Sequence, residues 1–141
     1  MTKNQTWGAR FGNVIMDAPF HTPSELVVHL PTPPTSNNLF ATDLKSGRRF
    51  RTYEYKSWVQ EAGLLLNRQR PPLVAGKVSI LLEVEEPKTA RRQDVCNREK
   101  ACIDLLVSRG VIQSDDQRHV REVTMRWAPV DGVRITIRGC E

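Results

Sequence analysis

Residues 78–110 read VSILLEVEEPKTARRQDVCNREKACIDLLVSRG, the segment of the chain that is most informative about its fold. Its first eight residues alternate in the manner of a β-strand, with one apolar face made by Val78, Ile80, Leu82 and Val84. Asp94 and Asn97 are both suitable caps for a helix, and a helix-spaced apolar side follows at Cys102, Ile103, Leu105 and Leu106. Gly110 suits the end of that helix. The stretch therefore predicts a strand, a polar motif and a helix in succession.

The segments on either side predict three more strands and one longer helix. Residues 25–30 alternate and stop at Pro31, which predicts a first strand. Thr52 can cap a helix that runs to about Arg68, because the apolar side chains between them fall on one stripe. Residues 123–127 and 133–137 alternate, and residues 129–132 are predicted to join them as a hairpin. The predicted order is β-α-β-α-β-β, an α/β fold in which two main helices cover one face of a mixed β-sheet.

Length and charge limit the possible organisation and partners. A chain of 141 residues with 39% hydrophobic content can bury one core of ordinary size, so we predict an irregular N-terminal arm over residues 1–24 and a single domain over residues 25–141. A formal net charge of +5 and a pI near 9.4 favour polyanionic partners, with solubility as the alternative explanation.

Targeting signals and cysteine spacing indicate the compartment. The sequence has no signal-peptide pattern and no run of about 18 apolar residues, which predicts a protein without membrane contact, located in the cytoplasm or at the nucleoid. Three cysteines, an odd number without zinc-ligand spacing, argue against a disulfide framework or a structural zinc site.

The polar motif contains the groups that phosphodiester cleavage requires. Cleavage needs a nucleophilic water, neutralisation of charge at phosphorus and help for the leaving oxygen, and Mg²⁺ held by carboxylates supplies all three. Asp94 after the strand and Asp115 after the helix are therefore the candidate catalytic residues and metal ligands. Lys100 is the candidate for contact with the scissile phosphate. Each has a structural alternative: a helix cap for Asp94, a turn for Asp115, and a pair with Asp104 for Lys100.

Basic and amide side chains nearby are candidates for binding the DNA backbone. Arg91, Arg92 and Asn97 surround Asp94 in the sequence. A second group lies in residues 45–51, which we interpret as an exposed basic loop that contributes Lys45, Arg48, Arg49 and Arg51.

Two segments resemble the RusA-like Holliday-junction resolvases. Residues 30–38, LPTPPTSNN, are similar to the proline-asparagine segment near the start of that family. Residues 92–117 look like the family's Asp-x-Asp-Asn helix and downstream acidic turn. The resemblance covers about residues 25–138.

This resemblance implies a homodimeric α/β nuclease that binds branched DNA, especially four-way junctions. It implies paired, symmetry-related nicks made with Mg²⁺ or Mn²⁺ during DNA recombination and repair. Carried over by position, Asp94 is the first motif carboxylate, Asp115 the downstream catalytic carboxylate and Lys100 the functional lysine, with Asn97 also at the site.

The chain departs from the family pattern at Cys96, where the second aspartate of the motif is expected. A thiol is a poor ligand for a hard cation such as Mg²⁺, so metal affinity should fall unless another oxygen compensates. The candidates for that oxygen are Asp104, Asp116, Glu83 and Glu85. A more tolerant metal such as Mn²⁺ is an alternative.

Three hypotheses follow for the function. The first is a metal-dependent endodeoxyribonuclease that resolves four-way junctions. The second is a catalytically degenerate relative that binds branched DNA, because Cys96 replaces an aspartate. The third is an unrelated basic α/β protein that serves as an interaction or RNA-binding subunit.

Overall fold

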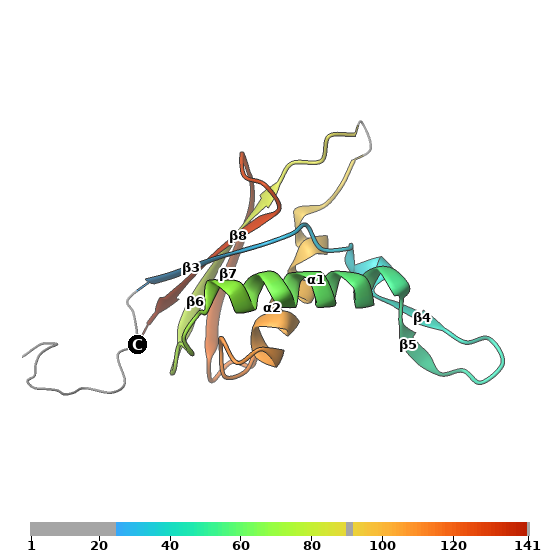
Figure 1. Cartoon of the computed structure of the whole chain (residues 1–141), viewed down its shortest axis with the longest axis horizontal. Coiled ribbons are helices and arrows are strands. Elements are labelled where there is room, and N and C mark those ends of the chain that lie inside the picture. Colours follow the sequence, from blue (N-terminus) through green and yellow to red (C-terminus); the bar gives the residue numbers. More distant parts are fainter. Residues whose placement is uncertain (1–24, 90–91, 141) are drawn as a thin grey trace, which may run out of the picture.

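The computed structural model describes residues 25–89 and 92–140. The predicted N-terminal arm and the predicted phosphate contact Arg91 lie outside these residues. Two helices and a mixed sheet confirm the predicted β-α-β-α-β-β order, with a small extra hairpin (Figure 1). The elements are β3 (Glu25–Leu30), η1 (Ser36–Asn38), β4 (Phe40–Thr42), β5 (Arg49–Arg51), α1 (Tyr53–Gln69), β6 (Val78–Glu85), η2 (Val95–Arg98), α2 (Glu99–Ser108), β7 (Val120–Ala128) and β8 (Val133–Gly139).

The main sheet has the strand order β3-β8-β6-β7. β8 runs antiparallel to both β3 and β6, whereas β6 and β7 are parallel. The predicted hairpin of residues 129–132 is therefore wrong, because β6 lies between the two strands that these residues connect. Four residues are enough to cross two strand spacings, about 10 Å.

Glu83 gives a physical reason for the central position of β6. It lies directly opposite Arg126 of β7 on one side and Arg134 of β8 on the other, and its carboxylate pairs with both. Opposite charges at facing positions stabilise a strand pair. Pairing β7 directly with β8 would leave Glu83 with one of these arginines at most.

The core lies between one face of the sheet and the two helices. The inward residues of β6 are those that the sequence predicts, and Val78, Leu82 and Val84 have no exposed surface. They pack in one cluster with Tyr55, Trp58, Ala62 and Leu66 of α1 and with Cys102, Leu105 and Leu106 of α2. No helix among the described residues is long and apolar enough to cross a membrane.

Both helices begin close to the predicted caps. The Thr52 side chain accepts a hydrogen bond from the Tyr55 N–H at 3.2 Å, and α1 ends one residue after the predicted Arg68. The Asp94 carboxylate accepts from the Cys96 N–H at 3.1 Å, but the turn that it caps is the 3₁₀ helix η2. The regular α2 follows from Glu99, and Gly110, just past its end, has the positive φ of 72° that favours glycine.

The segment predicted as an exposed basic loop is partly a second, smaller sheet. β5 pairs with β4 to form a β-hairpin that extends away from the rest of the molecule (Figure 1). Arg49 and Arg51 therefore lie on a strand, whereas Lys45 and Arg48 lie in the turn. The alternation that would reveal strands of three residues is too short to detect in the sequence.

Candidate functional site

A polar pocket of about 900 Å³ surrounds Asp94, between the two 3₁₀ helices. One wall comes from η1 and the residue before it, and the other from η2 and the residues before it. Trp127 of β7 is the aromatic member of the lining. The lining residues are Thr35, Asn37, Asn38, Arg92, Gln93, Asp94, Val95, Asn97, Arg98 and Trp127. The structure thus brings three predicted site residues, Arg92, Asp94 and Asn97, to one place.

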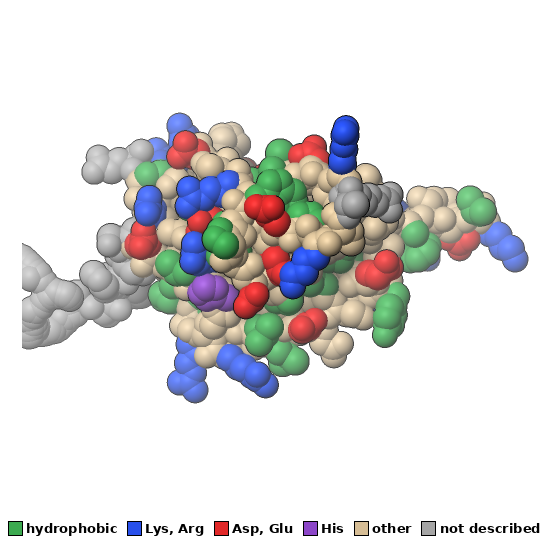
Figure 2. Space-filling model, turned by 90° about the horizontal axis from the view of Figure 1, so that it is seen from above, with side chains coloured by type: hydrophobic (Ala, Val, Ile, Leu, Met, Phe, Trp, Pro, Cys, Tyr) green, Lys and Arg blue, Asp and Glu red, His purple; other side chains and the backbone are tan. Residues whose placement is uncertain are grey.

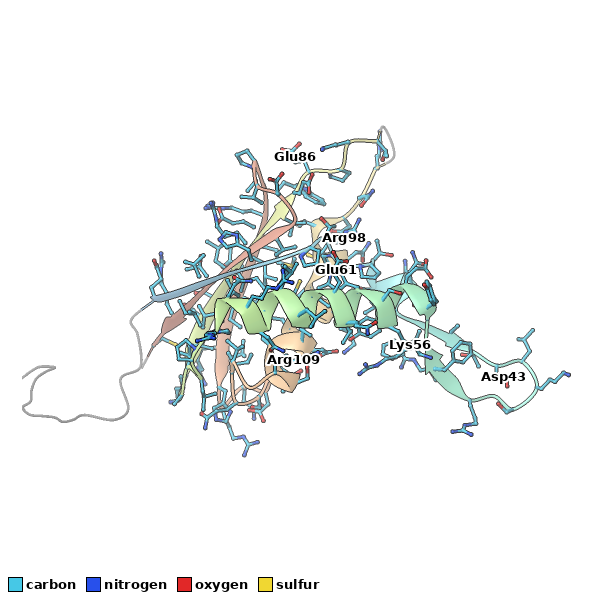
Figure 3. All side chains as sticks on the ribbon, viewed as in Figure 1. Asp43, Lys56, Glu61, Glu86, Arg98 and Arg109 are labelled. Atoms are coloured by element: carbon cyan, nitrogen blue, oxygen red, sulfur yellow. The ribbon has the colours of Figure 1, made fainter. Side chains whose placement is uncertain are left out.

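Hydrogen bonds that join the two 3₁₀ helices and the residues before them hold this pocket in shape. The Ser36 hydroxyl donates to the Asn97 carbonyl at 3.1 Å. The Arg98 guanidinium donates to the Pro33 carbonyl and to the Gln93 side chain, and it lies in the body of the protein (Figure 3). Burial lowers the pKa of Arg98. A partly buried guanidinium held in this way adds a fixed positive charge to the wall.

Lys100 and Asp115 lie together in a second, smaller hollow of about 240 Å³. Its lining also includes Glu99 and Asp104 from α2 and Val123 from β7. The Lys100 ammonium donates to the Asp104 carboxylate at 3.0 Å, as one of the structural alternatives expects. That hydrogen bond is the main cause of the raised pKa of Lys100, and the charge of Asp115 adds to it.

The structure places Asp94 and Asp115 in different hollows. Residues 25–89 and 92–140 contain no group of three His, Cys, Asp or Glu side chains arranged to hold a metal ion. Mg²⁺ commonly keeps several waters and binds through one or two carboxylates together with substrate phosphates. The donor set around Asp94, one carboxylate among amide and arginine side chains, does not form a complete protein cage and suits a cation that takes further ligands from a bound phosphate.

The four carboxylates considered as replacements for the missing aspartate all have other partners. Asp104 pairs with Lys100, and Asp116 accepts three hydrogen bonds from the Arg118 side chain and one from its N–H. Glu85 accepts from the Gly132 N–H at 2.9 Å. Glu83 lies on the sheet face opposite the core, bound to two arginines. None of the four lines the Asp94 pocket.

Glu83 is consequently a structural residue, and its removal should lower stability. Its side-chain oxygens accept from Arg126 at 2.6 Å and from Arg134 at 2.8 Å, and the residue is only 4% exposed. In Glu83→Gln the amide NH₂ group faces an arginine donor and the charge is lost. We expect the free energy of unfolding in urea to fall by about 1–3 kcal/mol. The matched control is Glu25→Gln, which removes the exposed pair with Arg138 and should cost less than about 1 kcal/mol.

The contribution of Glu83 to the free energy of unfolding should also depend on pH. The two arginine hydrogen bonds lower the pKa of Glu83 from 4.5 to about 2 in the folded protein. A carboxyl group whose folded pKa is lowered stabilises the fold fully above its unfolded pKa and loses that contribution as the pH falls through the folded value. The stability difference between wild type and Glu83→Gln should therefore be constant above about pH 5 and shrink toward pH 2. A difference independent of pH over this interval would contradict the assignment.

The acidic turn after α2 is stabilised by its own side chains. The Ser114 hydroxyl and His119 Nδ1 are 2.7 Å apart, and His119 Nδ1 is 3.7 Å from an Asp116 oxygen. Hydrogen bonds from Arg118 lower the pKa of Asp116 well below its usual range. Asp116 and His119 thus shape the turn, while Asp115 faces the Lys100 hollow.

The predicted basic residues of the β4–β5 hairpin form a third group. The Arg49 guanidinium lies 4.1 Å from the centre of the Phe40 ring, and that of Arg51 lies 5.1 Å from the centre of the Tyr55 ring. Stacking on a ring leaves the edge of a guanidinium free to donate to a phosphate. No salt bridge within residues 25–89 and 92–140 involves either arginine.

Several pocket residues were not among the predicted site residues. Asn37 and Asn38 belong to the proline-asparagine segment, so the similarity of residues 30–38 to a nuclease family was a usable signal. Arg98 and Trp127 had no such signal. Trp127 fits the alternating pattern of a core-facing strand, and only the three-dimensional structure shows that it also borders the pocket.

The comparison with protein families agrees with this arrangement. Residues 31–138 match the family model described as endodeoxyribonuclease RusA, and this range includes both hollows and the hairpin. The search of curated proteins found no match. Nucleases of the RusA family resolve Holliday junctions and generally depend on a divalent metal. Because the match spans most of the chain, and the fold has the expected order of helices and strands, this chain belongs to the RusA family of endodeoxyribonucleases.

Proposed function

We propose that this protein nicks four-way DNA junctions, with the scissile phosphate bound in the Asp94 pocket. The observation that carries the proposal is the combination in one hollow of an exposed carboxylate with two arginines and several amide side chains. Arginines attract and orient phosphate, and amide N–H groups donate to its oxygens. A carboxylate in the same place would repel the DNA phosphates unless it bound a cation.

The proposed cation is Mg²⁺ or Mn²⁺, held by Asp94 together with oxygens of the DNA. When bound, it supplies charge neutralisation at phosphorus and a more acidic water. Arg92 and Arg98 contribute positive charge at the wall, while Asn37 and Asn38 lie across the pocket from Asp94. The Asp94 side chain is oriented by the Cys96 N–H, which fixes one of its oxygens at 3.1 Å.

We propose that Lys100 and Asp115, which line the second hollow, take part in the same reaction. Trp127 of the Asp94 pocket and Val123 of the Lys100 hollow are both partly exposed residues of the edge strand β7, so DNA lying along this strand would pass both. Lys100 would then contact the backbone beside the cleaved bond, with the Asp115 carboxylate in the same hollow.

A pair of variants separates this role of Lys100 from a purely structural ion pair. Lys100→Gln should lower the nicking rate on the order of a hundredfold, because a charged donor to the phosphate is lost. Asp104→Asn removes the same ion pair but keeps the ammonium, so nicking should remain near the wild-type rate. An exposed pair of this kind contributes about 0.5 kcal/mol, and both variants should have nearly wild-type melting temperatures. Equal loss of nicking in both variants would contradict the assignment.

Paired nicks require two active sites, and we propose a homodimer for that reason. A four-way junction has two-fold symmetry, which a symmetric dimer matches with one site on each of two opposite strands. Light scattering of the free protein and of its junction complex measures the number of chains directly. A monomer in both states would remove the basis for coordinated paired nicks.

A second candidate function is junction binding without efficient cleavage. The observation that favours it is Cys96, an exposed thiol in place of the family's second aspartate, with all four replacement carboxylates engaged elsewhere. Such a protein would hold branched DNA through the same arginines but bind the metal too weakly for rapid turnover.

One assay distinguishes the two functions. Wild-type protein is incubated with a four-way junction and with linear duplex of the same sequence, in Mg²⁺, in Mn²⁺ and in chelator. Metal-dependent, symmetric nicks on the junction alone support the nuclease, whereas tight junction binding without nicks supports the second candidate. Equal affinity for the junction and the duplex at moderate salt would contradict both.

A further inference from the structure

We propose that the β4–β5 hairpin is a wedge that opens the branch point of a DNA junction, with Leu44 at its tip inserted between base pairs. This inference rests on the proposed function, since it takes junction DNA as the ligand. It adds the surface that would distinguish a branch point from continuous duplex.

Leu44 has no packing role among the described residues. It is 98% exposed, and every residue from Thr42 to Arg51 is exposed. The hairpin projects from the body, and its end carries hydrophobic and basic side chains (Figure 2). Single exposed leucines are common on protein surfaces. A leucine at the far end of a projecting arm, however, is placed to reach into another molecule.

The turn that presents Leu44 is held by a compact set of hydrogen bonds around Asp43. The Asp43 carboxylate accepts from the Lys45 N–H at 2.9 Å and from the Ser46 hydroxyl at 3.1 Å. Its backbone N–H donates to the Arg48 carbonyl at 2.8 Å, and its carbonyl accepts from the Gly47 N–H at 2.7 Å. Gly47 has the positive φ of 72° that closes the turn. Leu44 is thus presented by an ordered turn.

The base of the hairpin is joined to the Asp94 pocket. Thr52, directly after β5, donates from its N–H to the Leu39 carbonyl at 3.0 Å and from its hydroxyl to the Asn38 carbonyl at 2.6 Å. Asn38 lines the pocket, and the Phe40 ring packs edge-on against the Tyr55 ring of α1 at 5.6 Å. DNA bound in the pocket would therefore lie at a fixed place relative to the wedge, although Asp43 at the tip is well apart from Arg98 (Figure 3).

The charge of the hairpin favours DNA as the occupant. Its basic side chains are Lys45, Arg48, Arg49 and Arg51, against the single carboxylate of Asp43, which is used within the turn. A basic arm with an apolar tip complements a polymer that is anionic outside and apolar between its bases. Proteins that bend DNA insert leucine and similar side chains between base steps in this way. Base pairs at a branch point have the least stacking to lose.

The test measures base opening independently of cleavage. Wild-type protein and Leu44→Ser are titrated, in chelator, into a four-way junction that carries 2-aminopurine at the branch point, and into the matched duplex. We expect the fluorescence of the junction to rise with wild type and not with Leu44→Ser. Leu44→Ser should bind the junction about tenfold more weakly than wild type does, and it should bind the duplex with the wild-type affinity. Leu64→Ser, which alters an exposed leucine on α1, is the matched control and should behave as wild type. Lys45→Gln should weaken binding to both DNAs alike.

Other outcomes would overturn the wedge. If wild type binds the junction without a fluorescence rise, or if Leu44→Ser gives the same rise, the wedge is wrong and the proposed function still stands. If wild type does not prefer the junction to the duplex, both fail. If Leu44→Ser instead changes the molecular mass in light scattering, the tip is a contact between copies of this chain. Leu44→Ser should keep the wild-type melting temperature because the side chain it replaces is exposed.

Discussion

Replacing Asp94 by asparagine should lower the rate of junction nicking by a hundredfold or more. The substitution removes the negative charge that we assign to cation binding but keeps an oxygen that accepts from the Cys96 N–H. Asparagine and aspartate are about equally good helix caps, so the 3₁₀ turn and the pocket should persist. Junction affinity in chelator should stay at the wild-type value or increase, because a negative charge near phosphate is removed.

The measurement is single-turnover nicking of a labelled junction over a Mg²⁺ titration, together with the melting temperature. Asp131→Asn is the matched control, since Asp131 is an exposed aspartate in the turn between β7 and β8 and lines neither hollow. Asp131→Asn should nick at the wild-type rate. If Asp94→Asn also nicks at that rate, Asp94 only caps η2 and the metal position lies elsewhere.

The elements of the fold were predictable because their signals are local. The alternation of Val78, Ile80, Leu82 and Val84 gives β6, and Thr52 gives the start of α1. Pairing between strands is not local. The Glu83 ion pairs favour the position of β6 between β7 and β8, but the two arginine partners are 43 and 51 residues away in the chain. Residues 129–132 therefore resembled a tight hairpin connection that the structure does not contain.

The candidate site was likewise predictable only where it depends on residues that are close in the sequence. Arg92, Asp94 and Asn97 are neighbours in the sequence and meet in one pocket, as expected for residues within one short segment. A metal ion shared by Asp94 and Asp115 requires the two carboxylates to approach each other, which depends on how α2 returns along the sheet. The structure places the two residues in different hollows. Asn38 joined the site only through the packing of η1 against η2. Contacts of this kind come from tertiary packing, which no sequence period encodes.

Restoring an aspartate at Cys96 should increase metal-dependent nicking, and we expect a gain of about 10–100-fold at low Mg²⁺. Cys96 is exposed and two residues from Asp94, with its N–H bound to the Asp94 carboxylate. A second carboxylate there would add a hard oxygen ligand and a negative charge close to the first. The gain should be larger with Mg²⁺ than with Mn²⁺, because Mn²⁺ tolerates a softer set of ligands.

Two controls separate ligand chemistry from charge and from loss of the thiol. Cys140→Asp adds the same charge at another exposed cysteine, and Cys96→Ser removes the thiol without adding a carboxylate. Neither should raise nicking by more than a small factor. Mn²⁺ binding followed by electron paramagnetic resonance gives a readout besides activity, and Cys96→Asp should bind more tightly. If Cys96→Asp gains neither affinity nor rate, the thiol is not what limits metal binding. If wild type already nicks as fast as Cys96→Asp at every metal concentration, the second candidate function is excluded and Asp94 with DNA oxygens is sufficient.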